Sequence, residues 1–291
     1  MKSFKIMEKT KIWFAISLVI IITGLVFFIK DGLNYGIDFR GGTLVQINMK
    51  QDFNKQDVEK IIAKYANDYT TNTAVNEKNE VQLEIRSNSL EEGEIQPLFK
   101  EVKDKYKLAD KDLISQQTIG PAVGQELRQK AILAFVLANV AILIYVAIRF
   151  EFKFGAAAIL AIIHDILITV SVYSIFQIPI NSSFIAAILT IAGYSINDTI
   201  VIFDRIRENV KKMRRIDSKE IANISITQTM SRSVNTTLTT LITIVAVYIF
   251  VPSIREFTFP LTIGIACGAY SSIFIASPIW VLLKNRKIKE A

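Results

Sequence analysis

The chain has 291 residues, and a mean hydropathy of +0.35 with 51% hydrophobic residues makes it too apolar for an ordinary soluble domain. Its formal net charge is +7, but residues 31–130 hold 14 Lys and Arg against 17 Asp and Glu, so the positive excess lies on the apolar remainder and favours anionic lipid headgroups over nucleic acid. The single Cys, Cys267, and the single His exclude a disulfide framework and a thiolate cluster, and we expect neither a zinc site nor a cofactor.

The first element expected in the chain is a membrane helix over 12–29. Its apolar stretch is longer than the about 7–15 residues of a signal-peptide core, and no small-x-small cleavage site precedes Asp31. We therefore expect residues 1–30 to form a cytoplasmic N-terminus and a retained first span.

Residues 31–130 are the one stretch that is large enough to fold outside the membrane. Alternating apolar residues predict strands at 43–49 and 81–85, and helical periodicity predicts helices over 55–65 and 90–106. With a last strand at 113–119 and a short one at 73–76, the order is β-α-β-β-α-β, which is that of a ferredoxin-like α+β domain. Because this stretch holds no catalytic constellation, we expect it to bind or move rather than react.

Five further apolar blocks are long enough to cross a hydrocarbon core about 30 Å thick. They cover about 131–150, 156–176, 184–203, 234–251 and 257–283. Lys and Arg concentrate before the first span, near 149–153, in a basic loop over 204–233 and in the C-terminal tail. Since such residues mark cytoplasmic connections, the sequence predicts a multi-pass cell-membrane protein with six helices, cytoplasmic termini and an extracytoplasmic domain over 31–130.

One span contains a polar run, Gly193-Tyr194-Ser195-Ile196-Asn197-Asp198-Thr199. An ionisable group at that depth costs roughly 3 kcal/mol on insertion scales and usually marks an ion path, a proton relay or a buried pair. Three spans repeat polar residues at helical spacing: Thr190, Tyr194 and Asp198; Asp165, Thr169 and Tyr173; and Arg232, Thr236, Thr239 or Thr240, and Thr243. Together these faces would enclose a hydrated cavity.

Each charged residue in this set also has a structural interpretation. Asp198 would lock helix packing, and Arg232 would extend to the cytoplasmic headgroups. The pair His164-Asp165 would either join a proton relay or form a hydrogen bond between helices. The sequence leaves these alternatives open.

A glycine-rich motif follows the first span: Gly36-Ile37-Asp38-Phe39-Arg40-Gly41-Gly42-Thr43. Paired glycines permit conformations that a Cβ forbids, and Asp38 and Arg40 are spaced to face one side of an extended segment. The motif lacks the lysine and the spacing of a phosphate-binding P-loop, so a turn at the membrane exit is the simplest alternative.

These motifs together resemble SecF, the protein-export membrane subunits of the SecD/SecF family within the resistance-nodulation-division superfamily. The resemblance rests on the glycine-rich motif, on His164-Asp165 and on the polar run with its continuation, Phe203-Asp204-Arg205-Ile206-Arg207-Glu208-Asn209. It covers nearly the whole chain, including the six spans and the one large loop.

The resemblance implies a non-enzymatic subunit that pairs with SecD and associates with the SecYEG channel. Such subunits use the proton gradient to complete preprotein export after the ATP-driven SecA motor has acted. It also implies that Asp198 and Arg232 serve proton passage, and that a separate SecD subunit is needed because the chain lacks a SecD half.

The hypothesis that follows is a coupling between protonation and movement. Arg232 would hold Asp198 ionised, and protonation of Asp198 would swing the domain over 31–130 through hinges at Gly41-Gly42 and Gly120-Pro121-Ala122-Val123-Gly124. One alternative is a proton-driven small-molecule exporter of the wider superfamily, although such exporters usually carry two six-span halves and larger outer domains. Another is an intramembrane serine hydrolase built from Ser195, His164 and an Asp, although Ile196 replaces the second glycine of G-x-S-x-G.

Overall fold

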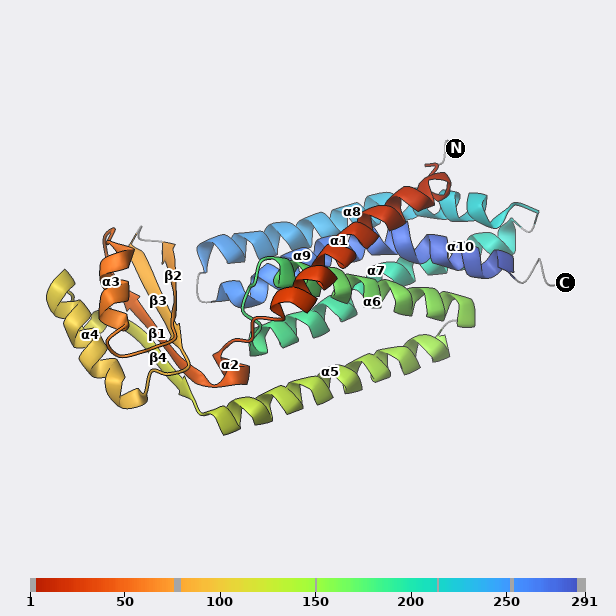
Figure 1. Ribbon diagram of the computed structural model, residues 1–291. Helices are drawn as coiled ribbons and strands as arrows, with labels where there is room; N and C mark the ends of the chain where they lie inside the picture. The colour runs from red at the N-terminus through yellow and green to blue at the C-terminus, as the bar shows by residue number, and fades with distance from the viewer. Residues whose placement is uncertain (1–3, 76–79, 150, 214, 252–253, 287–291) are drawn as a thin grey trace.

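The computed structural model describes residues 4–75, 80–149, 151–213, 215–251 and 254–286. A bundle of long helices carries a small α/β domain at one end, and the short helix α2 (Ile37–Arg40) lies at the junction (Figure 1). Helix α1 begins and α10 ends at the opposite end of the bundle. The fold is thus a polytopic helical protein with one α+β domain, as predicted.

The α/β domain has the predicted β-α-β-β-α-β order. Its elements are β1 (Gly42–Asn48), α3 (Lys55–Ile62), β2 (Thr70–Val75), β3 (Val81–Ser87), α4 (Glu92–Tyr106) and β4 (Leu113–Ile119). The strands form an antiparallel sheet in the order β2-β3-β1-β4. Strand β2 begins at Thr70, three residues before the expected start, because residues 70–72 continue the pairing with β3.

Helices α3 and α4 lie on the side of this sheet that faces away from the bundle (Figure 1). Alternate residues of β1, Val45 and Ile47, are wholly buried beneath them together with Leu98 and Val102 of α4. Burying an aliphatic side chain of this size contributes about 1.5–3 kcal/mol. The domain therefore has a hydrophobic core of its own, separate from the core of the bundle.

Six helices of the described residues are long and apolar enough to cross a membrane. They are α1 (Thr10–Asp31), α5 (Pro121–Arg149), α6 (Phe152–Ile175), α7 (Ser182–Lys212), α8 (Ser218–Phe250) and the run from α9 (Arg255–Ser271) through a π-helical turn (Ser272–Ala276) to α10 (Ser277–Arg286). Between 50% and 67% of the most apolar window is buried in α6, α7 and the last run, against 6–11% in α1, α5 and α8. Helices α6, α7 and the run from α9 to α10 therefore form the centre of the bundle, and α1, α5 and α8 lie at its periphery.

Two expected boundaries differ in the structure. Helix α5 begins at Pro121, so residues 121–130 are helical and continuous with the expected span over 131–150. A proline suits the first helical position because no intrahelical bond needs its missing N–H. The expected basic loop over 204–233 is mostly helical, because α7 continues to Lys212 and Asp217 caps the start of α8. Buried Ile206 and Ile226 extend the apolar faces of these helices through the charged stretch.

Helices α7 and α9 pack closely because α9 carries two glycines that face α7. A Cβ at Gly264 would lie 2.2 Å from Cδ1 of Ile191, and one at Gly268 would lie 3.2 Å from Cβ of Ser195. The G-x-x-x-G spacing therefore serves close helix approach, as it does in membrane helix pairs generally. This approach brings the polar side chains of α9 to those of α6 and α7.

Candidate functional site

Asp165 of α6 is the centre of a buried polar cluster. Its side chain is fully buried, and its Oδ2 accepts hydrogen bonds from Ser195 Oγ of α7 at 2.6 Å and Ser271 Oγ of α9 at 2.7 Å. Its Oδ1 accepts from Cys267 Sγ of α9 at 3.2 Å and lies 2.9 Å from Nδ1 of His164. Both side-chain oxygens thus have hydrogen-bond partners, as a buried polar group requires.

His164 connects this cluster to the first helix. Its Nε2 lies 2.8 Å from Oγ of the buried Ser17 on α1, and its ring stacks on Tyr270 at a centroid distance of 6.2 Å. With Asp165 ionised, Nδ1 donates to the carboxylate and Nε2 accepts from the Ser17 hydroxyl. We call Ser17, His164, Asp165, Ser195, Cys267 and Ser271 the Asp165 cluster; it joins helices α1, α6, α7 and α9.

The Asp165 cluster brings together three kinds of atom that can bind a metal ion: an imidazole nitrogen, a carboxylate oxygen and a thiol sulfur. Those atoms of His164, Asp165 and Cys267 lie within 4.8 Å of one another. In the described structure they contact each other at hydrogen-bond lengths, and the carboxylate is saturated by two further hydroxyls. This arrangement is a satisfied hydrogen-bond network, which does not require a metal ion to balance it.

The arrangement does not suit the serine hydrolase alternative. Ser195 donates to Asp165 and not to His164, whose two ring nitrogens contact Asp165 and Ser17. Ser17, His164 and Asp165 are in contact in the order of a serine, histidine and aspartate triad. Ser17, however, lies within α1, where the backbone N–H groups are used by the hydrogen bonds of the helix. An oxyanion hole needs free donors beside the nucleophile, and a mid-helix serine has none from its own backbone.

Asp198 lies one turn after Ser195 on α7 and faces α8. It is 5% exposed, and its Oδ2 accepts a hydrogen bond from Thr237 Oγ1 at 3.4 Å. Among the described residues no ion pair joins it to Arg232, which is exposed, although the Arg232 charge still acts on the Asp198 carboxyl from a longer distance. Arg232 precedes Thr237 by five residues, which places its backbone about 7.5 Å further along α8.

The polar stripes on α7 and α8 are only partly enclosed. Thr190, Gly193 and Asn197 of α7 are exposed, at spacings that place them on one face. The exposed residues of α8 include Arg232, Asn235, Thr236, Thr239 and Thr243. We call these eight residues the α7–α8 polar stripe; Tyr194 ties its two helices together by donating to Thr240 Oγ1 at 3.2 Å.

The glycine-rich motif forms a turn that holds the outer end of α7. Asp38 lies in α2, so Asp38 and Arg40 belong to a helical turn and not to the expected extended segment. The Oδ2 of Asp38 accepts a hydrogen bond from the backbone N–H of Ser182 at 2.8 Å, at the first residue of α7. A carboxylate there is favoured by the unpaired N–H groups and the positive end of the helix dipole.

The two expected hinges pack against each other. Gly41 and Gly42 have φ angles of 80° and 128°, which L side chains rarely adopt. A Cβ at Gly124 of α5 would lie 2.8 Å from the Gly41 backbone nitrogen, and one at Gly41 would lie 2.9 Å from Pro121. Gly36 joins the same region by donating its N–H to the Ile180 carbonyl at 2.7 Å. The glycines thus form one close-packed joint.

An ionic contact also ties the outer domain to the bundle. Arg86 of β3 pairs with Glu84 of the same strand at 2.6 Å and with Glu256 at the start of α9. Glu256 in turn accepts from the side chain of Asn181, the residue that caps α7. Burial alone would lower the pKa of Arg86, but the two glutamates raise it above its ordinary value.

The remaining predicted residues lie at the other end of α7. Asp204 forms ion pairs with Arg207 at 2.8 Å and Arg149 at 3.5 Å. Arg205 binds Glu208 at 2.6 Å and the side chain of Gln228 on α8 at 2.7 Å. These partly exposed charges join helix ends and are separate from the Asp165 cluster.

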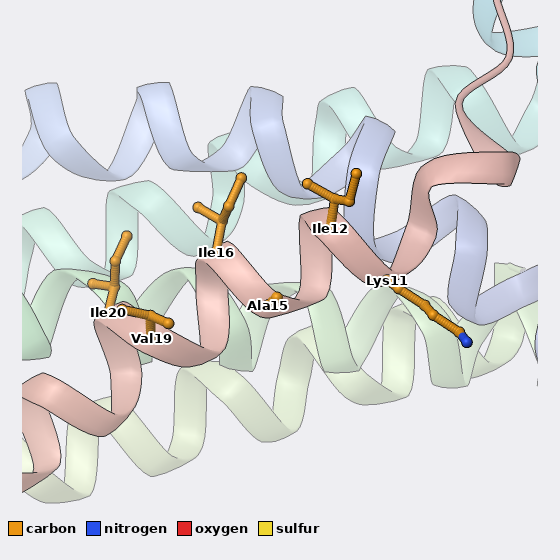
Figure 2. A pocket seen from close by; sticks show the side chains of 6 residues that line it. All are labelled: Lys11, Ile12, Ala15, Ile16, Val19 and Ile20. Carbon is orange, nitrogen blue, oxygen red and sulfur yellow. The ribbon is translucent and has the colours of Figure 1, made fainter.

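A hollow of about 530 Å³ on α1 has a different character (Figure 2). Ile12, Ile16 and Ile20 project from one side of the helix, while Lys11 points the other way. Apart from that lysine its lining is apolar. Such a surface suits lipid contact and supplies no reactive group.

Sequence reasoning found His164, Asp165 and Asp198 but missed Ser17, Cys267 and Ser271 as partners. Ser17 and Ser271 are single small polar residues in apolar helices, so no local pattern distinguishes them. The sequence does contain one relevant signal, the pair Gly264 and Gly268 on α9. This pair predicts that α9 packs closely on a neighbouring helix, with Cys267 and Ser271 next to the contact face.

Comparison with known proteins agrees with this architecture. Residues 99–286 match the family described as protein export membrane protein SecD/SecF, C-terminal, and residues 26–52 match the SecD/SecF GG motif. The protein translocase subunit SecF of Haemophilus influenzae is 39% identical over 94% of this chain and 84% of its own length.

Two longer relatives contain the same unit. The protein translocase subunit SecDF of Bacillus subtilis is 37% identical over 97% of this chain but only 38% of its own length. The crystal structure of SecDF from Thermus thermophilus, described as a translocon-associated membrane protein, superposes with a TM-score of 0.85 at 34% identity and covers 98% of this chain and 39% of that chain. The chain therefore belongs to the SecD/SecF family of protein-export membrane proteins.

Proposed function

We propose that the chain is the SecF-type accessory subunit of a Sec preprotein translocase and that, with SecD, it uses the proton motive force to promote late export. The relatives named translocase subunit SecF support the role, since they match nearly the full length. The SecDF relatives support the SecD partner, because this chain accounts for only part of each. In this role the chain is a coupling subunit and not an enzyme.

The α7–α8 polar stripe is the surface on which we place the contact with SecD in the membrane. Hydroxyls of Thr236, Thr239 and Thr243 donate to carbonyls of their own helix, but Asn197 and Arg232 would face hydrocarbon if lipid covered them. Charged groups in spans face protein or water because exposure to lipid is costly. A SecD subunit would cover this stripe and exclude lipid from it.

The single observation that carries the proton role is the position of Asp198. It is a buried carboxylate with one long hydrogen bond, and it lies beside the α7–α8 polar stripe. A carboxyl group with few partners in a membrane can gain and lose a proton with little rearrangement of others, whereas Asp165 has four partners to rearrange. We therefore assign the primary proton site to Asp198, with His164 and Asp165 as a second, more rigid station of the relay.

Helix α7 supplies a mechanical link to the outer domain. Sixteen residues separate Asp198 from Ser182, which is about 24 Å along a helix, and Ser182 is held by Asp38 of the glycine joint. A shift of α7 on protonation would pull on that joint and on the Arg86–Glu256 contact. One proton moved through 100 mV supplies about 2.3 kcal/mol, which is enough to bias two positions of the outer domain.

Orientation and the remaining partners complete the proposal. The basic ends of the chain would lie in the cytoplasm and the α/β domain outside, which agrees with their placement at opposite ends of the bundle. The complex would associate with the SecYEG channel and act on preproteins after SecA. The small-molecule exporter is the alternative, but the full-length relatives are named translocase subunits.

The test is export in membrane vesicles that contain SecD with or without this chain. A preprotein is advanced by ATP, and completion of its export is then followed with the proton gradient intact or dissipated. We expect gradient-dependent completion only when the chain is present and co-purifies with SecD. Equal completion without the chain would contradict the proposal, and increased drug sensitivity with normal export would favour the exporter.

A further inference from the structure

A polar cavity lies between the outer domain and the membrane bundle. Its volume is about 430 Å³, within the range of roughly 300–1,000 Å³ that is usual for binding sites. One wall comes from residues 34–37, Arg40 and Pro179 at the outer end of the bundle, and the other from residues 67–70 and 86–88 of the outer domain. We call it the junction cavity.

The charges of the junction cavity are balanced. Arg86 is already neutralised by Glu84 and Glu256, and Asp68 offsets Arg40. Burial alone would raise the pKa of Asp68, but hydrogen bonds from Ser89, Asn88 and Ser87 lower it below its ordinary value, so it is ionised at neutral pH. A site selective for phosphate or another anion needs an excess of donors and positive charge, which this cavity lacks.

Its lining instead has the composition of a surface that binds polypeptides of varied sequence. Nine of its residues are of the types that dominate antibody combining sites, where Tyr gives rigid contact area and Asn, Ser and Gly give adaptable hydrogen bonding. They are Asn34, Tyr35, Gly36, Arg40, Asn67, Tyr69, Arg86, Ser87 and Asn88. The side-chain amides of Asn67 and Asn88 form no hydrogen bond to other described residues, so they can bind peptide groups.

The cavity also opens at an unpaired sheet edge. Among the described residues, strand β2 is an outer strand of the sheet and pairs with β3 alone, and its first residue, Thr70, lines the cavity together with Tyr69. Free N–H and C=O groups of an edge strand bind extended peptides without regard to their side chains. On β2 the Thr71 carbonyl already accepts from Lys55 Nζ at 3.0 Å, so a peptide would use the other groups of this edge. An exported chain, which is unfolded as it leaves a channel, presents such extended segments.

We propose that the junction cavity holds an extended segment of the exported polypeptide, with backbone contacts from Asn67, Asn88 and the start of β2. This inference rests on the proposed function and adds a contact site for its substrate. Because the two walls belong to the outer domain and to the bundle, any movement between them changes the width of the cavity. A cycle of gradient-driven movement would then alternate between a tight and a loose grip.

Site-specific photocrosslinking tests this assignment. A photoreactive amino acid replaces Asn67 or Asn88 in the full chain, and the control replaces Lys100, an exposed residue of α4 on the side of the domain away from the bundle. Vesicles with SecD and each variant receive a labelled preprotein that is stalled in the channel. Stalling depends on the ATP-driven step, so it proceeds even if the proposed gradient function is wrong.

We expect preprotein adducts at both cavity positions, with at least about tenfold more product than at Lys100, the ratio that corresponds to 1.4 kcal/mol of preference. Adducts should disappear when the stalled chain is released. Equal labelling at the three positions, or no polypeptide adduct at Asn67 and Asn88, would overturn the proposal. Adducts with phospholipid in place of polypeptide would also overturn it and would assign the cavity to headgroups.

Discussion

Replacing Asp165 with Ala should destabilise the bundle more than any other single loss of a membrane polar group described above. Ala removes the acceptor for Ser195, Ser271, Cys267 and His164 at once. Side-chain hydrogen bonds in membrane proteins average about 0.6 kcal/mol with a maximum near 1.7, and a buried donor left without a partner costs about 1–3 kcal/mol. The cost of burying the carboxyl group is also removed, which offsets part of this, so we expect a loss of about 2–4 kcal/mol.

Asp165→Asn serves as the shape-matched variant. It keeps one acceptor oxygen, and hydroxyls on Ser195 and Ser271 can rotate to accept from the new amide, so we expect a loss of about 1 kcal/mol. Asp204→Ala is the control for loss of an acidic group, because its partly exposed ion pairs should contribute less than about 1 kcal/mol.

The assay is the free energy of unfolding of the purified chain in detergent micelles, measured by steric trapping or by a denaturant titration. A double-mutant cycle with Ser195→Ala would separate the Asp165–Ser195 term from the rest. If Asp165→Ala costs no more than Asp204→Ala, the cluster does not hold the helices together and the reasoning fails.

Three further changes have defined outcomes. Gly124→Ala should lower the free energy of unfolding by about 1–3 kcal/mol, because its Cβ would lie 2.8 Å from the backbone of Gly41. The control Gly93→Ala should not destabilise, because its Cβ would have nothing within 4 Å. Thermal unfolding of the two variants compares them, and equal effects would contradict this packing. Asp38→Ala should raise amide exchange in the first turn of α7 by about fivefold through loss of about 1 kcal/mol of capping. Unchanged exchange would show that Asp38 does not hold the helix. Burial alone would raise the pKa of Asp112, but Lys50 and the Ala109 N–H lower it below its ordinary value of 3.8. The ionised Asp112 therefore stabilises the folded outer domain above pH 3.8, and this stabilisation is lost as the pH falls through the lowered pKa. Asp112→Asn should reduce the acid sensitivity of the outer domain, measured as unfolding by tyrosine fluorescence.

The sequence predicts the outer domain well because its signals are local. Alternation at Val45 and Ile47 and helical spacing at Val58, Ile61 and Ile62 each report a face that a small two-layer domain must bury. The order of elements then leaves few topologies, and the one observed is the expected one.

The candidate site could be predicted only in part, because its partners come from distant helices. Asp165 and Asp198 are conspicuous as carboxylates in apolar segments, but register between helices decides that Ser195 faces Asp165 and Thr237 faces Asp198. The same register leaves Arg232 close enough to Asp198 for its charge to act on that carboxyl, without a described ion pair between the two. Composition marks 204–233 as a basic connection between two spans, but it does not show that α7 continues without a break to Lys212 with Ile206 buried.

The most direct test of the central claim is gradient-dependent completion of export with Asp198→Asn. Vesicles contain SecD and the wild-type chain, Asp198→Asn or the control Thr23→Ala on the exposed face of α1, and a pull-down confirms equal assembly. We predict that Asp198→Asn loses the gradient-dependent component while the control keeps it. Normal gradient-dependent export with Asp198→Asn would show that this carboxylate is not on the proton path and would contradict the account.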